Sequence, residues 1–188
     1  MIKSISINQP TFLPWVGWFD LVDHSDVFVV LDDVQFSKQS WQQRNRIRTS
    51  KGLEFITIPV KNKDKQTILD VEIAENHFEK KIIKSIFTNY KKSKFFDKYF
   101  DEFSDIINQS TKSHKLSLLN LNLIKWLAEK LNIKKNFFYS SEININGERG
   151  EYIANICKHF KCDLYISPIG AKNYILEDIK HFENKEVE

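Results

Sequence analysis

The sequence has few of the residues that mark several classes of protein. Its 188 residues include five glycines, four prolines, one methionine and two cysteines. Cys157 and Cys162 have too few partners for a disulfide scaffold or a metal cluster, so we expect reduced thiols. No segment approaches 18 apolar residues, and the N-terminus lacks the apolar core of a signal peptide. We therefore expect no transmembrane segment and a cytoplasmic location.

Several chemical signatures are also missing. There is no glycine-rich loop of the P-loop or dinucleotide-binding type, no nucleophile elbow and no zinc-ligand spacing, and the five histidines are scattered. We predict no metal site, and the sequence names no cofactor. The formal net charge is only +3 and comes mostly from dispersed lysines, which disfavours nucleic acid as a partner.

What remains is a globular composition, 41% hydrophobic and 13% aromatic, in which strand and helix patterns alternate. Expected strands lie at 2–8, 26–33, 52–60, 68–73, 137–143 and 163–167. Expected helices lie at 11–26, within 75–135, at 148–160 and at 168–179. The alternation predicts an α/β fold, a three-layer Rossmann-like, mainly parallel sheet with a helical insertion or cap. We expect one domain over 1–188, with 75–135 as the helical insertion.

Three polar clusters follow the ends of expected strands. They are Asn8-Gln9-Pro10, then Asp32-Asp33-Val34-Gln35, then Ser167-Pro168-Ile169-Gly170. Because open α/β sheets bind ligands outside the carboxyl ends of their strands, these clusters predict a binding site for a polar small molecule. Each cluster also has a simpler interpretation, as a polar turn that ends a strand.

Arg44, Arg46 and Arg48 alternate with Asn45 and Ile47, so an extended segment would place all three arginines on one face. Lysine far outnumbers arginine in this chain, and the guanidinium fork suits phosphate or carboxylate. The pattern indicates an anion-binding face; the alternative is a solvated edge strand. Trp41 would stack on a base or sugar, or close the core.

Asp32 and Asp33 could act as a general base, ligate a divalent metal, or bind hydroxyl or amino groups. Either could instead be a turn residue or a partner for Arg44 or Arg46. Serines follow two expected strands, at 140–141 and 167, which leaves an acyl-accepting serine open.

The stretch "INQPTFLPWVGWFDLVDHSDVFVVLDDVQFSKQSWQQRNRIR" closely resembles the start of the WbqC-like family, and "FITIPV", "FFYSSEI" and "CDLYISPIGAKNYI" resemble its later blocks in the same order. Two departures are that Pro168 stands where members tend to have glycine, and that members usually continue further past the last block. The family's motif positions map here onto Asp32 and Asp33, and onto Gln9, Pro10, Gln35, Lys38, Trp41, Arg44, Asn45, Arg46, Ser141, Ser167, Gly170 and Tyr174. We expect Asp32 and Asp33 to be catalytic and the other mapped residues to bind substrate.

The same resemblance implies a role in bacterial surface-polysaccharide biosynthesis, of O-antigen or capsule, with acyl or aminoacyl transfer to a nucleotide-linked amino sugar. In this hypothesis Arg44 and Arg46 hold the phosphates, and Asp33 or Asp32 orients or deprotonates the attacking amine. One alternative is an ATP-dependent enzyme that activates carboxylates or transfers nucleotidyl groups. Another is a non-catalytic scaffold whose partner surface includes Phe95, Phe96 and Tyr99.

Overall fold

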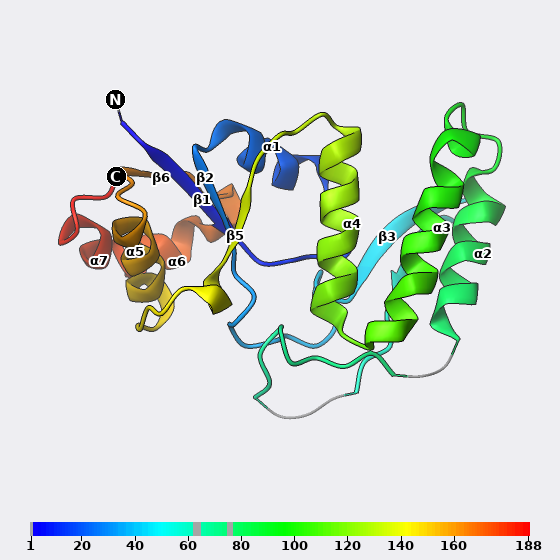
Figure 1. The fold of residues 1–188 in the computed structure, drawn as a ribbon, viewed down its shortest axis with the longest axis horizontal. Helices are drawn as coiled ribbons and strands as arrows, with labels where there is room; N and C mark the ends of the chain where they lie inside the picture. Colours follow the sequence, from blue (N-terminus) through cyan, green and yellow to red (C-terminus); the bar gives the residue numbers. More distant parts are fainter. Residues whose placement is uncertain (1, 62–64, 75–76) are drawn as a thin grey trace. The chain divides into compact units, whose positions relative to one another are not determined.

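The computed structural model of the protein describes residues 2–61, 65–74 and 77–188, which divide into two compact units (Figure 1). The first unit comprises Met1–Gln9, Pro14–Asp32 and Ala128–Glu188. The second comprises Pro10–Leu13 and Asp33–Leu127. Within the described residues, no helix has both the length and the apolar content that a membrane crossing requires. The assignment of 1–188 to a single domain stays a prediction.

The first unit is built on a four-stranded parallel sheet. β1 (Ser4–Asn8) lies at its centre, pairing with β2 (Val27–Val30) on one side and β6 (Leu164–Tyr165) on the other, and β2 pairs with β5 (Phe137–Tyr139). The order is therefore β5-β2-β1-β6 (Figure 1). Every residue of β2 is buried, as expected for a strand covered on both faces. The predicted α/β, Rossmann-like fold with a parallel sheet is confirmed.

Helices α1 (Val16–His24), α5 (Arg149–His159), α6 (Lys172–Glu177) and α7 (Ile179–Glu183) complete this unit, with short 3₁₀ helices at Ser140–Glu142 and Ile169–Ala171. Trp18 of α1 is buried, and its ring centre lies 4.8 Å from that of Phe28 in β2. The prediction placed the start of this helix near residue 11. α1 instead begins at Val16, because Leu13 has a left-handed backbone with φ of 51° and Trp15 an extended one with ψ of 163°, and neither conformation continues a right-handed helix.

The second unit combines an antiparallel ribbon with three helices. β3 (Arg44–Thr49) pairs with β4 (Gly52–Thr57), and α2 (Phe78–Tyr90), α3 (Phe96–Ser113) and α4 (Leu116–Lys130) follow. These helices occupy most of the predicted helical stretch 75–135, of which residues 75 and 76 lie outside the described residues. The expected strand at 68–73 is wrong, because only isolated bridges form there, Val60 with Ile73 and Glu72 with Lys115.

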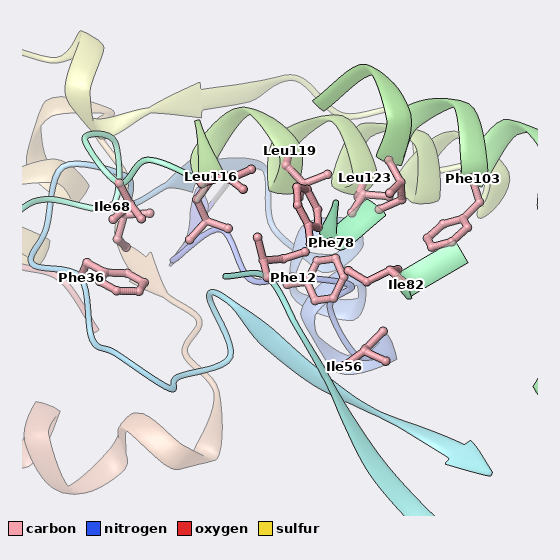
Figure 2. Close-up of a cluster of buried hydrophobic side chains, with 14 of the residues drawn as sticks. Phe12, Phe36, Ile56, Ile68, Phe78, Ile82, Phe103, Leu116, Leu119 and Leu123 are labelled. Atoms are coloured by element: carbon pink, nitrogen blue, oxygen red, sulfur yellow. The ribbon is translucent and has the colours of Figure 1, made fainter. Parts of the chain in front are cut away.

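A hydrophobic core holds the second unit together. Phe12 lies in one cluster with side chains of α2, α3 and α4 (Figure 2). Ile47 of β3 and Ile56 of β4 belong to the same cluster. Since side chains alternate across a strand, burying these two isoleucines turns their sequence neighbours outward. The core thus fixes which face of the ribbon meets solvent.

Candidate functional site

The carboxyl ends of β2 and β5 are joined by a cluster of Asp32, Ser140 and Ser141. Asp32 comes two residues after β2, and the serines begin the 3₁₀ helix directly after β5. Because the two strands are parallel neighbours, both polar segments leave the same edge of the sheet. The sheet thereby places next to each other residues more than 100 positions apart in the sequence.

The Asp32 carboxylate accepts three hydrogen bonds. Its Oδ1 accepts from Ser140 Oγ at 3.1 Å and from the Ser141 N–H at 3.0 Å, and its Oδ2 accepts from Ser141 Oγ at 2.9 Å. The Asp32 N–H in turn donates to Ser140 Oγ at 3.1 Å. Asp32 and Ser140 are buried, whereas Ser141 is exposed. The Ser141 hydroxyl is therefore an exposed group that is hydrogen-bonded to a buried carboxylate, that of Asp32.

Other predicted residues follow the strands of the same sheet. Gln9 comes directly after β1, and its carbonyl accepts a hydrogen bond from Trp18 Nε1 at 3.2 Å. Ser167, half-buried, follows β6 by two residues. Gly170 lies exposed in the 3₁₀ helix after it, and Tyr174 lies in α6. Side-chain hydrogen bonds join two of the predicted residues in this unit, Asp32 and Ser141.

The second unit carries a different cluster, on the outward face of the β3–β4 ribbon. Arg44, Arg46 and Arg48 share this face, as their spacing predicted. Their cross-strand partners are Thr57, Phe55 and Leu53, in that order. Phe55 is 50% exposed, so an aromatic ring lies in solvent in the middle of the arginine row.

Two of the arginines stack on aromatic rings. The Arg44 guanidinium carbon lies 4.4 Å from the Phe55 ring centre, and that of Arg46 lies 5.5 Å from the Trp41 ring centre. Trp41, 48% exposed, has its ring centre 6.2 Å from that of Phe55. Such cation–π contacts attract a guanidinium to the face of a ring. We call Trp41, Arg44, Arg46 and Phe55 the arginine–aromatic platform.

The two arginines of the platform are not neutralised by acidic side chains of the described residues. Within residues 2–61, 65–74 and 77–188, neither Arg44 nor Arg46 forms an ion pair with a carboxylate. A guanidinium that is held in place by rings, without a neutralising partner, can donate hydrogen bonds to the oxygens of a phosphate or carboxylate ligand.

The amide side chains around the platform have structural partners. Asn45 Nδ2 donates to the carbonyls of Phe12 at 3.1 Å and Leu13 at 2.6 Å. Gln42 Oε1 accepts from the Ser37 N–H at 3.1 Å, and Gln43 Nε2 donates to the Ile58 carbonyl at 3.2 Å. These residues brace the loop before β3. The amide of Asn45, predicted to bind substrate, is directed at the backbone instead.

The remaining predicted residues are dispersed over the second unit. Pro10 is buried, and its carbonyl accepts from Asn120 Nδ2 at 3.0 Å. Asp33 is half-buried. Gln35 is exposed and bridges to Thr67 through the backbone, and Lys38 is exposed in the loop before β3. No side-chain contact joins Lys38 or Gln35 to the platform among the described residues.

Two members of these clusters escaped the sequence analysis. Phe55 was assigned only to a strand, although its exposure depends on the register with Arg46, which the hairpin sets. Ser140 was considered with Ser141 only as an acyl-accepting serine, not as a partner of Asp32; its position directly after an expected strand was the available signal. Across the described ranges, no group of three or more His, Cys, Asp or Glu side chains is arranged to hold a metal ion.

Comparison with known proteins identifies one relative of this chain and its family. The chain is 31% identical over 180 residues to the uncharacterized protein Rv1507c of Mycobacterium tuberculosis, an alignment that covers 95% of this chain and 78% of that protein. No solved structure matches the chain significantly. Residues 9–188 match the WbqC-like protein family. The chain belongs to the WbqC-like protein family, which is associated with polysaccharide biosynthesis.

Proposed function

We propose that the protein is a transferase of bacterial surface-polysaccharide biosynthesis, of O-antigen or capsule, that moves an acyl or aminoacyl group onto a nucleotide-linked amino sugar. Family membership supports the pathway, and the arginine–aromatic platform is the observation that carries the substrate class. The proposal places the protein in the cytoplasm, where nucleotide sugars are made.

The platform suits a nucleoside diphosphate. Residues two apart in a strand are separated by about 6.6 Å, so Arg44 and Arg46 can reach neighbouring phosphates of one diphosphate. Phe55 and Trp41 hold the two forks in place, which limits the entropy lost on binding. Trp41 offers a half-exposed ring, and stacking of a base on such a ring contributes about 1–3 kcal/mol.

A carboxylate in the same unit as the platform is the proposed proton acceptor. Asp33 belongs to that unit and is half-buried, so a substrate amine can reach it. As the amine nitrogen bonds to the acyl carbon, its proton moves to the Asp33 carboxylate. The donor's leaving group departs with the electron pair of its bond to the acyl carbon. Asp32 remains the alternative base.

The test of substrate class is calorimetric titration of the purified protein with UDP-, GDP- and dTDP-amino sugars. Losing one charge-assisted fork costs about 1.5–3 kcal/mol, so Arg44→Lys should raise Kd at least tenfold although the charge is kept. Arg149→Lys, on α5 of the other unit, is the matched control and should bind like the wild type. Equal affinity of Arg44→Lys and the wild type would rule out the proposed binding of phosphate by the Arg44 guanidinium.

The same titration separates the alternative enzyme class. Binding of ATP with Mg²⁺, without binding of any nucleotide sugar, would replace the proposal with an ATP-dependent activating enzyme. Once an amino sugar is identified, Asp33→Asn tests the proton acceptor. We expect a drop in turnover of about 10²–10⁴-fold, typical of losing a positioned base, with the affinity for the nucleotide sugar unchanged.

A further inference from the structure

The connection between α2 and α3 carries a concentration of positive charge. Within residues 87–100, which we call the hairpin tip, lie four lysines and one acid. The lysines are Lys91, Lys92, Lys94 and Lys98, and the acid is Asp97. The resulting net charge of +3 equals the formal net charge of the entire chain. The rest of the protein is therefore neutral on balance, so the tip is, with the arginine row of β3, one of its locally cationic segments.

Aromatic rings lie among these lysines. Phe87 is 45% exposed and Phe95 is 56% exposed. Phe87 packs on Phe96 and Phe100, with ring centres 5.8 and 5.6 Å away. None of the lysines is buried, and three ammonium groups lie over rings: Lys91 over Phe87, Lys94 over Phe95 and Lys98 over Tyr99, at 5.1–5.4 Å. Apolar rings and ammonium groups thus share one surface.

The tip is held by backbone hydrogen bonds. The N–H of Lys91 donates to the Phe87 carbonyl at 3.0 Å, and the N–H of Ser93 donates to the Tyr90 carbonyl at 2.8 Å. The Phe96 N–H donates to the Ser93 carbonyl at 3.0 Å and starts α3. Figure 1 shows α2 and α3 side by side, joined at one end by this turn. The lysines and phenylalanines are therefore presented by two packed helix ends.

We propose that the hairpin tip docks the protein on an anionic phospholipid surface. Aromatic side chains such as Phe95 insert at the level of the headgroups, while lysines extend toward lipid phosphates. The residue type separates this surface from a nucleic-acid site. All four arginines, the usual readers of bases and phosphate forks, lie outside the tip. The tip instead combines the point charges of its lysines with two exposed phenylalanine rings, Phe87 and Phe95, which carry no hydrogen-bonding group.

The test is flotation of the full chain with lipid vesicles. The wild type should float with vesicles of phosphatidylcholine and phosphatidylglycerol, and not with vesicles of phosphatidylcholine alone. Each lysine near an anionic surface strengthens binding about fivefold. Changing all four tip lysines to glutamine should therefore weaken binding by more than a hundredfold.

A matched control removes the same charge elsewhere. Lys134, Lys158, Lys172 and Lys180 are exposed and lie in the first unit, and changing all four to glutamine should leave vesicle binding within about threefold of wild type. Circular dichroism of both quadruple variants checks that they fold. Equal losses in the two variants would overturn the proposal, because net charge alone would then explain binding.

The aromatic contribution has its own test. Replacing Phe87 and Phe95 with serine should weaken binding about tenfold or more, since each ring buries apolar area in the interface, and the remaining binding should disappear at high salt. Membrane docking would be refuted if the wild-type protein did not bind vesicles that contain phosphatidylglycerol. It would also be refuted if the tip lysines bound single-stranded RNA and not the vesicles. Nucleotide-sugar binding in solution is independent of this outcome, so the two proposals fail separately.

Discussion

The guanidinium carbon of Arg44 lies 4.4 Å from the centre of the Phe55 ring, across the outward face of the β3–β4 ribbon. The two residues are diagonal neighbours, since Phe55 is directly opposite Arg46. The ring is half exposed, so this contact is formed in solvent, where it adds little to stability. We infer that the contact serves to position the guanidinium.

We predict that Phe55→Leu leaves the fold intact and weakens ligand binding. An exposed cation–π contact contributes about 0.5–1 kcal/mol, so the free energy of unfolding should fall by no more than this amount. Nucleotide-sugar affinity should fall further, about three- to tenfold, because Arg44 loses its support. Urea denaturation and calorimetry measure the two quantities. Leu53→Ala, on the same face opposite Arg48, is the control, and an equal loss of affinity there would contradict a specific role for Phe55.

Asp32→Asn should destabilise the protein by about 1–3 kcal/mol. The neutral amide accepts hydrogen bonds more weakly, and its NH₂ group would face donors from Ser140 or Ser141 in a buried position. The measurement is the midpoint of chemical unfolding at neutral pH. Asp33→Asn is the neighbouring control, and its half-buried side chain should cost less. A more stable Asp32→Asn variant would show that burial of the charge outweighs its hydrogen bonds.

Asp26 should give the protein a specific response to acid. The Ser4 N–H and then the Ser4 hydroxyl donate to its Oδ2, both at 2.8 Å, and these bonds lower the pKa of the Asp26 carboxyl below 3.8. Its folded-state pKa is thus below the unfolded value. The stabilising effect is present above the unfolded pKa and disappears as the pH falls through the folded pKa. Acid unfolding of Asp26→Asn should be less steep below pH 4 than that of the wild type. Asp23→Asn, an exposed control, should unfold like the wild type.

Both cysteines should be unreactive in the native protein. Burial, followed by the neighbouring Cys162, raises the pKa of the Cys157 thiol to about 12, and burial also raises the pKa of Cys162. The thiolate is the reactive species, so a disulfide reagent at pH 8 should label neither residue. Both should react after denaturation in guanidinium. Rapid labelling of the folded chain would contradict the burial of this pair.

Asn120 should be a stability determinant of the second unit. Its Nδ2 donates to the carbonyls of Pro10 at 3.0 Å and Gln42 at 2.8 Å, and the residue is fully buried. Asn120→Ala leaves both carbonyls without this donor, at a cost of about 2–3 kcal/mol. Asn122→Ala, exposed on the same helix, should be neutral or slightly stabilising because alanine favours helix. Thermal unfolding compares them; similar melting temperatures would mean that other donors replace Asn120.

The features that local pattern determines were accessible from the sequence. The sequence indicated a strand within 26–33, and the parallel sheet contains it as the fully buried β2. The period-two spacing of Arg44, Arg46 and Arg48 indicated one face, and β3 provides it because Ile47 enters the core.

The features that depend on distant partners were not accessible. Phe55 joins the platform only through the register of β3 with β4. Asn45 was expected to bind substrate, and the sequence could not show that its amide nitrogen donates to backbone carbonyls of a remote segment, at Phe12 and Leu13. The helix start at Val16 depends on the left-handed Leu13, a conformation that leucine rarely adopts.

Asn45, between Arg44 and Arg46, points its amide inward to Phe12 and Leu13. The side chains on the inner and outer faces of β3 thus share one backbone. Local opening of the strand that releases Asn45 therefore also misaligns the guanidinium groups of Arg44 and Arg46. By thermodynamic linkage, a ligand that clamps the forks must oppose that opening. Hydrogen exchange at the β3 amides would then slow in proportion to ligand occupancy, so amide protection in this strand becomes a reporter of binding that requires no knowledge of the reaction.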